Sequence, residues 1–199
     1  MDFRDETSTG TGTGTGRKPK RGRALWRRFG RREGGSVAIE FAALVIPFSL
    51  LVFAILESCL AFAAQQMLAN ATDDVARQFR TGQLRPADLE ANPDRVSEEI
   101  CDRIKIVVAN TCPGLEVDLK SYPTFADAAS RRIRFKEGGD LDTDDFDTRP
   151  GQSGSKNQLR VFYRWPVITD FMRKSMSNLP DGTTLLFASV TWQNEPFDD

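Results

Sequence analysis

An uncharged apolar run, FAALVIPFSLLVFAIL from Phe41 to Leu56, most constrains how this chain can fold. As a helix, the run covers about 24 Å, and the wider segment 37–64 covers about 42 Å. A bilayer core about 30 Å thick lies between these lengths, so one transmembrane helix fits. We predict this helix over residues 36–64.

The flank before the run is strongly basic. Residues 1–35 carry ten Lys or Arg side chains and four acidic ones, a net charge of +6, and the other residues must carry −7 to give the chain's net charge of −1. Positive flanks stay in the cytoplasm, which predicts a cytoplasmic N-terminus and a C-terminal part on the outer side of the membrane. The Thr/Gly repeat at 7–16 has nothing to bury, so we expect 1–35 to be a disordered leader.

The basic leader and the apolar span each allow other interpretations. Arginines interleaved with Trp26 and Phe29 could form a nucleic-acid arm, but their place directly before an apolar span favours membrane topology, so we expect no nucleic-acid partner. A secretory signal could be cut near Ala63, yet the apolar region exceeds the usual length of about 7–15 residues. A plain signal anchor leaves Glu40 unexplained, because an unpaired carboxylate in hydrocarbon costs roughly 2.5–3.5 kcal/mol or more.

The residues around Glu40 form a motif: Gly35, four residues from Ser36 to Ile39, then Glu40 and Phe41. This spacing resembles the class III signal of type IV-like pilins and pseudopilins. With the proline and glutamate farther along the span and the helix of residues 66–77, it is similar to the TadE/TadG family of tight-adherence (Flp) pilus assembly proteins. Weaker similarity extends to VFYRWPVITDF and to the closing NEP, residues 194–196.

The resemblance implies a function and partners. A prepilin peptidase would cut after Gly35, with Gly34 as a second possible glycine, and leave Ser36 as a new cationic amine. Glu40 would neutralise that amine on an adjacent subunit, or else lie at the membrane interface. The implied protein is a minor pilin or pseudopilin that works with other pilin subunits and the Tad inner-membrane platform. The alternative is an unprocessed membrane-anchored periplasmic binding or sensor module.

Two more residues in the span stand out. Pro47 lacks a backbone N–H, so we predict a kink or a flexible point in the helix there. Glu57 lies about 25 Å along the axis from Glu40, near the outer interface. It could contact a partner in the membrane or the solvated headgroups, and both interpretations stay open.

The helix should continue beyond the membrane. Leu68, Ala71, Val75 and Phe79 recur at helical spacing, which predicts a packed continuation over 65–82 that stops at the Gly after Thr81. The remaining residues, 83–199, predict a small periplasmic α+β domain with an antiparallel sheet. Its expected helices follow Asn92 and cover 167–176, and its expected strands are 115–122, 130–136, 159–165 and 183–193.

Cysteine and aspartate usage suggest structural rather than catalytic roles. Cys101 and Cys112 should form a disulfide in the oxidising periplasm, whereas Cys59 in the span acts as a small apolar residue. The acidic loop 138–158 invites a calcium hypothesis, but it lacks the EF-hand glycine and closing glutamate, so we favour a solvated loop and predict no metal or cofactor. The chain has no histidine, which excludes a Ser–His–Asp or Cys–His enzyme, and we expect no enzymatic activity.

Overall fold

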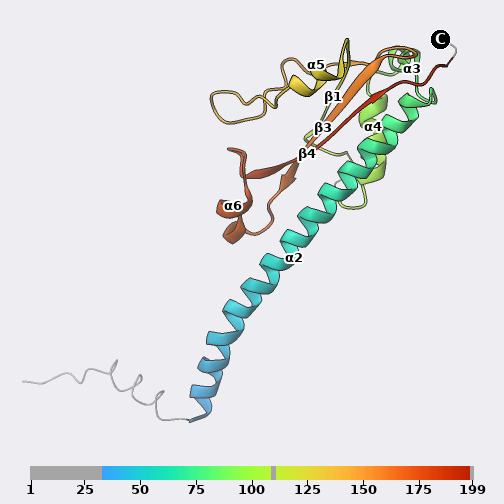
Figure 1. Cartoon of the computed structure of the whole chain (residues 1–199). Coiled ribbons are helices and arrows are strands. Elements are labelled where there is room, and N and C mark those ends of the chain that lie inside the picture. The colour runs from blue at the N-terminus through green and yellow to red at the C-terminus, as the bar shows by residue number, and fades with distance from the viewer. Residues whose placement is uncertain (1–32, 109–110, 198–199) are drawn as a thin grey trace, which may run out of the picture. The chain divides into compact units, whose positions relative to one another are not determined.

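The computed structural model describes residues 33–108 and 111–197 (Figure 1). The chain divides into two units, Met1–Ser49 and Leu50–Asp199. Most of the expected leader, residues 1–32, lies outside the described residues. The fold is α+β: a long apolar helix is followed by a small domain with short helices and one sheet.

Helix α2, Glu33–Arg80, confirms the long helix predicted from the apolar run and its continuation. It is long and apolar enough to cross a membrane. The helix ends where Gly82 adopts a positive φ of 72°, and the N–H of Gln83 donates to the carbonyl of Gln78 at 2.9 Å. An L side chain is strained in this left-handed conformation, so the glycine stop was readable from sequence.

The C-terminal part of α2, residues 65–80, is called its outer part. It belongs to the core of the domain. Leu68, Ala71, Val75 and Phe79 are all buried, as their spacing predicts. Helix α4, Arg95–Ile104, contributes its own buried stripe to the same core, and a short helix α3, Pro86–Ala91, connects it to α2. Helix α3 was not predicted; it begins where the N–H of Arg85 donates to the Asp88 carboxylate at 2.8 Å.

The sheet has the strand order β2-β1-β3-β4. Strands β1 (Leu115–Tyr122), β3 (Lys156–Pro166) and β4 (Thr183–Gln193) pair antiparallel, and β1 and β4 have the predicted bounds. Strand β2 (Thr148–Arg149) pairs parallel with β1, so the sheet is mixed and the purely antiparallel prediction is wrong in this respect. Helix α6, Asp170–Met176, connects β3 to β4 and lies within the predicted range 167–176.

The strand predicted at 130–136 is wrong. Residues Phe125–Ser130 form helix α5, which begins where the Thr124 side chain accepts the N–H of Asp127 at 3.1 Å. The chain after α5 makes only an isolated bridge between Phe135 and Leu141. The N–H of Lys136 donates to the carbonyl of Asp140 at 2.8 Å, and the N–H of Asp142 donates to the carbonyl of Arg134 at 3.0 Å, so this segment bonds to its own loop and not to the sheet.

Different segments of the chain pack on the two faces of the sheet. On one face, fully buried Leu119, Leu159 and Val161 belong to the same core as the outer part of α2 and α4. On the other face, Phe146 of the acidic loop stacks on Phe162 of β3 with ring centroids 5.2 Å apart. The loop predicted to be solvated therefore covers this second face.

Candidate functional site

The signal motif lies at the start of α2. Gly35 and Ser36 belong to the helix, and Glu40 and Phe41 are exposed on it. Glycine in a helix costs roughly 1 kcal/mol relative to alanine, so this first turn can unwind at low cost to enter an extended conformation.

Pro47 lies inside α2 with its side chain exposed. The apolar side chains around it, including Ile46 and Phe48, are also exposed, at 60% and 64%. This part of α2 therefore presents an apolar surface for lipid or for other helices. The role of Pro47 as a flexible point stays a prediction.

Glu57 is buried, with 4% of its surface exposed, although it lies on the apolar helix. Its carboxylate accepts the backbone N–H of Ile168 at 2.6 Å and that of Thr169 at 3.2 Å, as well as the Thr169 hydroxyl. All three donors belong to Ile168 and Thr169, which lie between β3 and α6. A buried carboxylate needs such donors, because an unsatisfied charge in an apolar setting is costly. The partner of Glu57 within this chain was not foreseen, and its contact with another protein stays a prediction.

A second polar contact joins α2 to the edge of the sheet. The Gln65 side chain donates to the carbonyl of Phe187 at 2.8 Å and accepts the N–H of the same residue at 3.3 Å. Strand β4 is an edge strand, so this amide satisfies backbone groups that would otherwise face an open edge. Sequence alone gives no signal for this contact.

The closing NEP segment forms a third contact, at the end of α2. The N–H of Glu195 donates to the carbonyl of Arg80 at 2.9 Å. Buried Asn194 donates to the carbonyl of Gly151 at 2.9 Å and accepts from the indole of Trp192 at 2.8 Å. The two C-terminal segments that carried the weaker resemblance thus both hold the domain against α2.

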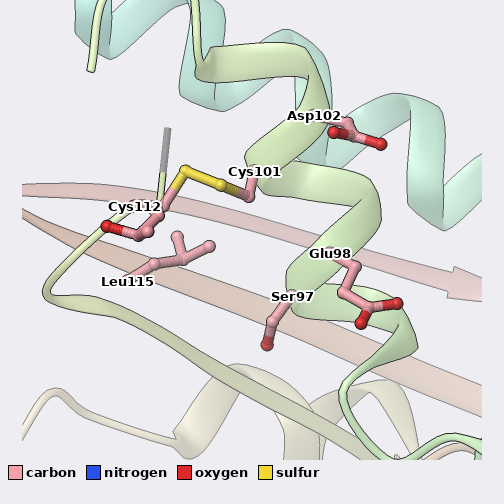
Figure 2. Close-up of a pocket in the computed structure, with 7 residues that line it drawn as sticks. Ser97, Glu98, Cys101, Asp102, Cys112 and Leu115 are labelled. Atoms are coloured by element: carbon pink, nitrogen blue, oxygen red, sulfur yellow. A yellow bond between two sulfur atoms is a disulfide. The ribbon is translucent and has the colours of Figure 1, made fainter. Parts of the chain in front are cut away.

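The predicted disulfide is present. Cys101 on α4 is bridged to Cys112, with the two Cα atoms 5.8 Å apart, within the range that a disulfide needs (Figure 2). The hollow beside it is lined by Ser97, Glu98 and Asp102 and lies open to solvent. Cys59 on α2 is unpaired and exposed.

The aspartates of the acidic loop are paired with cations. Asp140 accepts from Arg164 at 2.6 Å, and this hydrogen bond holds the pKa of the carboxyl below its usual value. Partial burial opposes ionisation of Asp145, but hydrogen bonding to Arg131 and the charge of Arg134 prevail, so its pKa is also lowered. Within residues 33–108 and 111–197, no three His, Cys, Asp or Glu side chains gather in a way that could hold a metal ion.

A buried ion pair beneath this loop was missed by the sequence analysis. Asp118 on β1 and Arg160 on β3 occupy paired register positions, and the Arg160 Nε lies 3.0 Å from the Asp118 carboxylate. Both side chains are almost fully buried, at 1% and 4% exposed. The sequence showed opposite charges on two predicted strands. It did not show that Asp118 and Arg160 are paired, because the register of the two strands was not known.

Comparison with known protein families finds a match over part of the chain. Residues 35–77 match the family described as TadE-like protein. No curated protein and no solved structure matches the chain. The matched segment begins at Gly35 and runs through the signal motif, Pro47, Glu57 and most of the buried stripe of α2. Over residues 35–77, therefore, this chain is similar to the TadE-like family.

Proposed function

We propose that this chain is a minor pilin or pseudopilin-type component of Tad (Flp) pilus assembly, anchored in the bacterial inner membrane. In this proposal a prepilin peptidase removes residues 1–35, and Ser36 becomes the N-terminal residue. The protein then acts with other pilin subunits and the Tad membrane platform through its helix and periplasmic domain. It acts by assembly and not by catalysis.

The observation that carries the proposal is the position of the family match. It starts at the glycine after which we expect cleavage and includes the glutamate five residues later. A carboxylate at position 40 costs little if a cationic amine neutralises it, and cleavage after Gly35 creates such an amine. The start of the match and the electrostatic argument both support the proposal of cleavage after Gly35.

The two parts of α2 give further support. The side chains of Val37, Leu44 and Phe53 are more than half exposed, whereas Val75 and Phe79 are almost fully buried in the domain. Such a helix can present its first part to lipid or to neighbouring helices while its last part holds a folded domain. This division of one helix suits a subunit that moves from a membrane into an assembly.

The test is the mature N-terminus. The full chain with a C-terminal tag is produced in cells with and without an active prepilin peptidase, purified from membranes and sequenced from its N-terminus. We expect Ser36 first when the peptidase is active and residues of the leader when it is absent. A start at Gly35 would move cleavage to the bond after Gly34.

Matched variants sharpen this test. Gly35→Val places a branched side chain at the scissile bond and should block cleavage, because close backbone approach needs a residue without a side chain. Gly34→Val makes the same change one residue away and should leave the start at Ser36. An intact leader in cells with an active peptidase would refute the proposal and favour the unprocessed membrane-anchored module.

A further inference from the structure

The segment between β3 and β4, residues 166–176, carries exposed apolar side chains. Ile168 is 68% exposed and Phe171 is 65% exposed. In the described part of the chain, only three other large apolar residues outside α2 are exposed: Ile106, Phe125 and Phe135. Two such side chains within four residues need an explanation, because soluble surfaces seldom keep large apolar groups together.

The hydrogen bonds of Glu57 fix where this segment lies along α2. Its carboxylate binds the N–H groups of Ile168 and Thr169, so the start of α6 lies beside residue 57. From Val37 to Glu57 the helix rises about 30 Å, the thickness of a bilayer core. When α2 crosses a membrane from Val37 onward, the segment 166–176 therefore lies at the outer boundary of the hydrocarbon.

The surface of α2 near this level is itself apolar. Phe53, Leu56 and Leu60, within four residues of Glu57, are 57%, 53% and 49% exposed. The exposed side chains of Ile168 and Phe171 therefore lie at the level of a surface that already suits lipid. This continuity favours a lipid partner for the segment over a separate protein.

The polar residues of the segment suit lipid headgroups. Helix α6 carries Arg173 and Lys174 in its last turn, both exposed, and one acid, Asp170, which pairs with Arg173 at 2.9 Å. The helix thus has a net charge of +1 beside its apolar side chains. Apolar groups with adjacent cations are typical of segments that bind at the interface of anionic membranes.

We propose that the segment 166–176 is a second membrane contact of the domain. Ile168 and Phe171 insert at the boundary between headgroups and acyl chains, and Arg173 and Lys174 lie among anionic headgroups. Glu57 positions the segment by holding its backbone against α2. The proposal requires α2 to cross a membrane, but it depends neither on cleavage after Gly35 nor on pilus assembly.

The test measures the depth of labels in the full chain reconstituted into vesicles of phosphatidylcholine and phosphatidylglycerol. A fluorophore is attached at Ser175→Cys on α6 in a Cys59→Ser background, with the disulfide left intact. Lipids with a doxyl group high on the acyl chain then quench any label that lies at the interface. We expect strong quenching of the label at position 175.

Two other label positions give controls. The native Cys59 on α2 reports whether the helix is in the bilayer. The second control label is at Ala129→Cys on α5. Phe125 of the same helix has its ring 5.9 Å from the Lys156 Nζ. Lys156 begins β3 and Pro166 ends it, so α5 and the segment 166–176 lie at opposite ends of this strand. A strand of this length spans roughly 35 Å, so the label at 129 should keep its fluorescence.

Substitutions then test the side chains that carry the contact. Ile168→Ser with Phe171→Ser should largely abolish quenching at position 175, whereas Phe125→Ser should leave it unchanged. These side chains are exposed, so the thermal melt of each variant should match that of the parent, which checks folding. Strong quenching that survives the double substitution would overturn the roles of Ile168 and Phe171.

The label results distinguish the absence of the second membrane contact from the absence of the membrane helix itself. Quenching at Cys59 without quenching at 175 would overturn the second membrane contact while leaving the membrane helix intact. No quenching at either position would overturn both. Shielding of position 175 that appears only as the protein-to-lipid ratio rises would assign the surface to a second copy of the chain and overturn the lipid proposal.

Discussion

The buried pair of Asp118 and Arg160 should be a main determinant of the stability of the domain, and Asp118→Asn tests this. The substitution keeps the shape of the side chain and removes its charge. The guanidinium of Arg160 then stays buried at 4% exposure without its counter-ion. An uncompensated buried charge is costly because protein solvates it far less well than water does.

The size of the effect follows from the surroundings of Arg160. Loss of one partner of a buried pair typically costs about 3–5 kcal/mol. The rings of Phe146 and Phe162, 5.7 and 6.0 Å from the guanidinium carbon, offset a part of this through cation–π attraction. We therefore expect a loss of about 3 kcal/mol in the free energy of unfolding.

Urea unfolding of the full chain in detergent, followed by the fluorescence of Trp165 and Trp192, measures this loss. With a slope of about 2 kcal/mol per molar urea, the midpoint should fall by about 1.5 M. The control is Asp144→Asn, which removes the partner of Lys136 from an exposed pair, with Asp144 75% exposed. Water screens an exposed pair, so its midpoint should move little.

A double substitution should reverse most of the effect of Asp118→Asn. Asp118→Leu with Arg160→Met replaces the pair by apolar side chains and should recover most of the stability lost in Asp118→Asn, since no unpaired charge remains. Equal midpoints for Asp118→Asn and Asp144→Asn would refute the argument. They would mean that water or a rearranged side chain neutralises Arg160 without cost.

Three more predictions concern assembly, the disulfide and acid. Glu40→Ala should leave cleavage by prepilin peptidase intact but abolish piliation or partner co-isolation, and unchanged piliation would argue against its role in subunit register. Replacing Cys101 and Cys112 by serine should cost about 3 kcal/mol, because the bridge closes a loop of 11 residues, and urea unfolding measures it. The folded-state pKa of Asp140 is lowered by Arg164, so its contribution to stability is complete above about pH 4 and is lost as pH falls through the lowered pKa. Asp140→Asn should therefore flatten the acid side of the stability profile, and an unchanged profile would contradict this.

Periodicity in the sequence was a sufficient guide wherever one element buries a regular stripe. Leu68 and Phe79 at helical spacing predicted the packed part of α2, and alternation in β1 predicted its bounds. The disulfide was predictable for a different reason, since Cys101 and Cys112 are close in sequence and lie beyond the membrane segment. In each case the signal is local, so one chain segment contains it.

The features that the sequence did not predict have a common physical cause. Each of them depends on contacts between distant segments of the chain. Alternation along β1 places Asp118 on the polar face of the strand, but residues 131–148 cover that face, and Phe146 stacks there. The parallel pairing of β2 with β1 arises from the path of the same loop. Nothing near Glu57 indicates that its donors come from Thr169, more than a hundred residues away.

The structure also bears on where the domain can be separated from its helix. Leu68, Val75 and Phe79 of α2 are each at most 1% exposed in the core of the domain. Burial of each contributes about 1.5–3 kcal/mol, so removing them costs about 6 kcal/mol, comparable to the whole stability of a small domain.

A fragment of residues 83–199 should therefore not fold, whereas a fragment of residues 65–199, which keeps the packed part of α2, should unfold cooperatively on heating. Near-ultraviolet circular dichroism of the two purified fragments distinguishes these outcomes. A cooperative melt of fragment 83–199 with an intact disulfide would show that the sheet and α4 are stable alone. The outer part of α2 would then be attached to the domain without being part of its core.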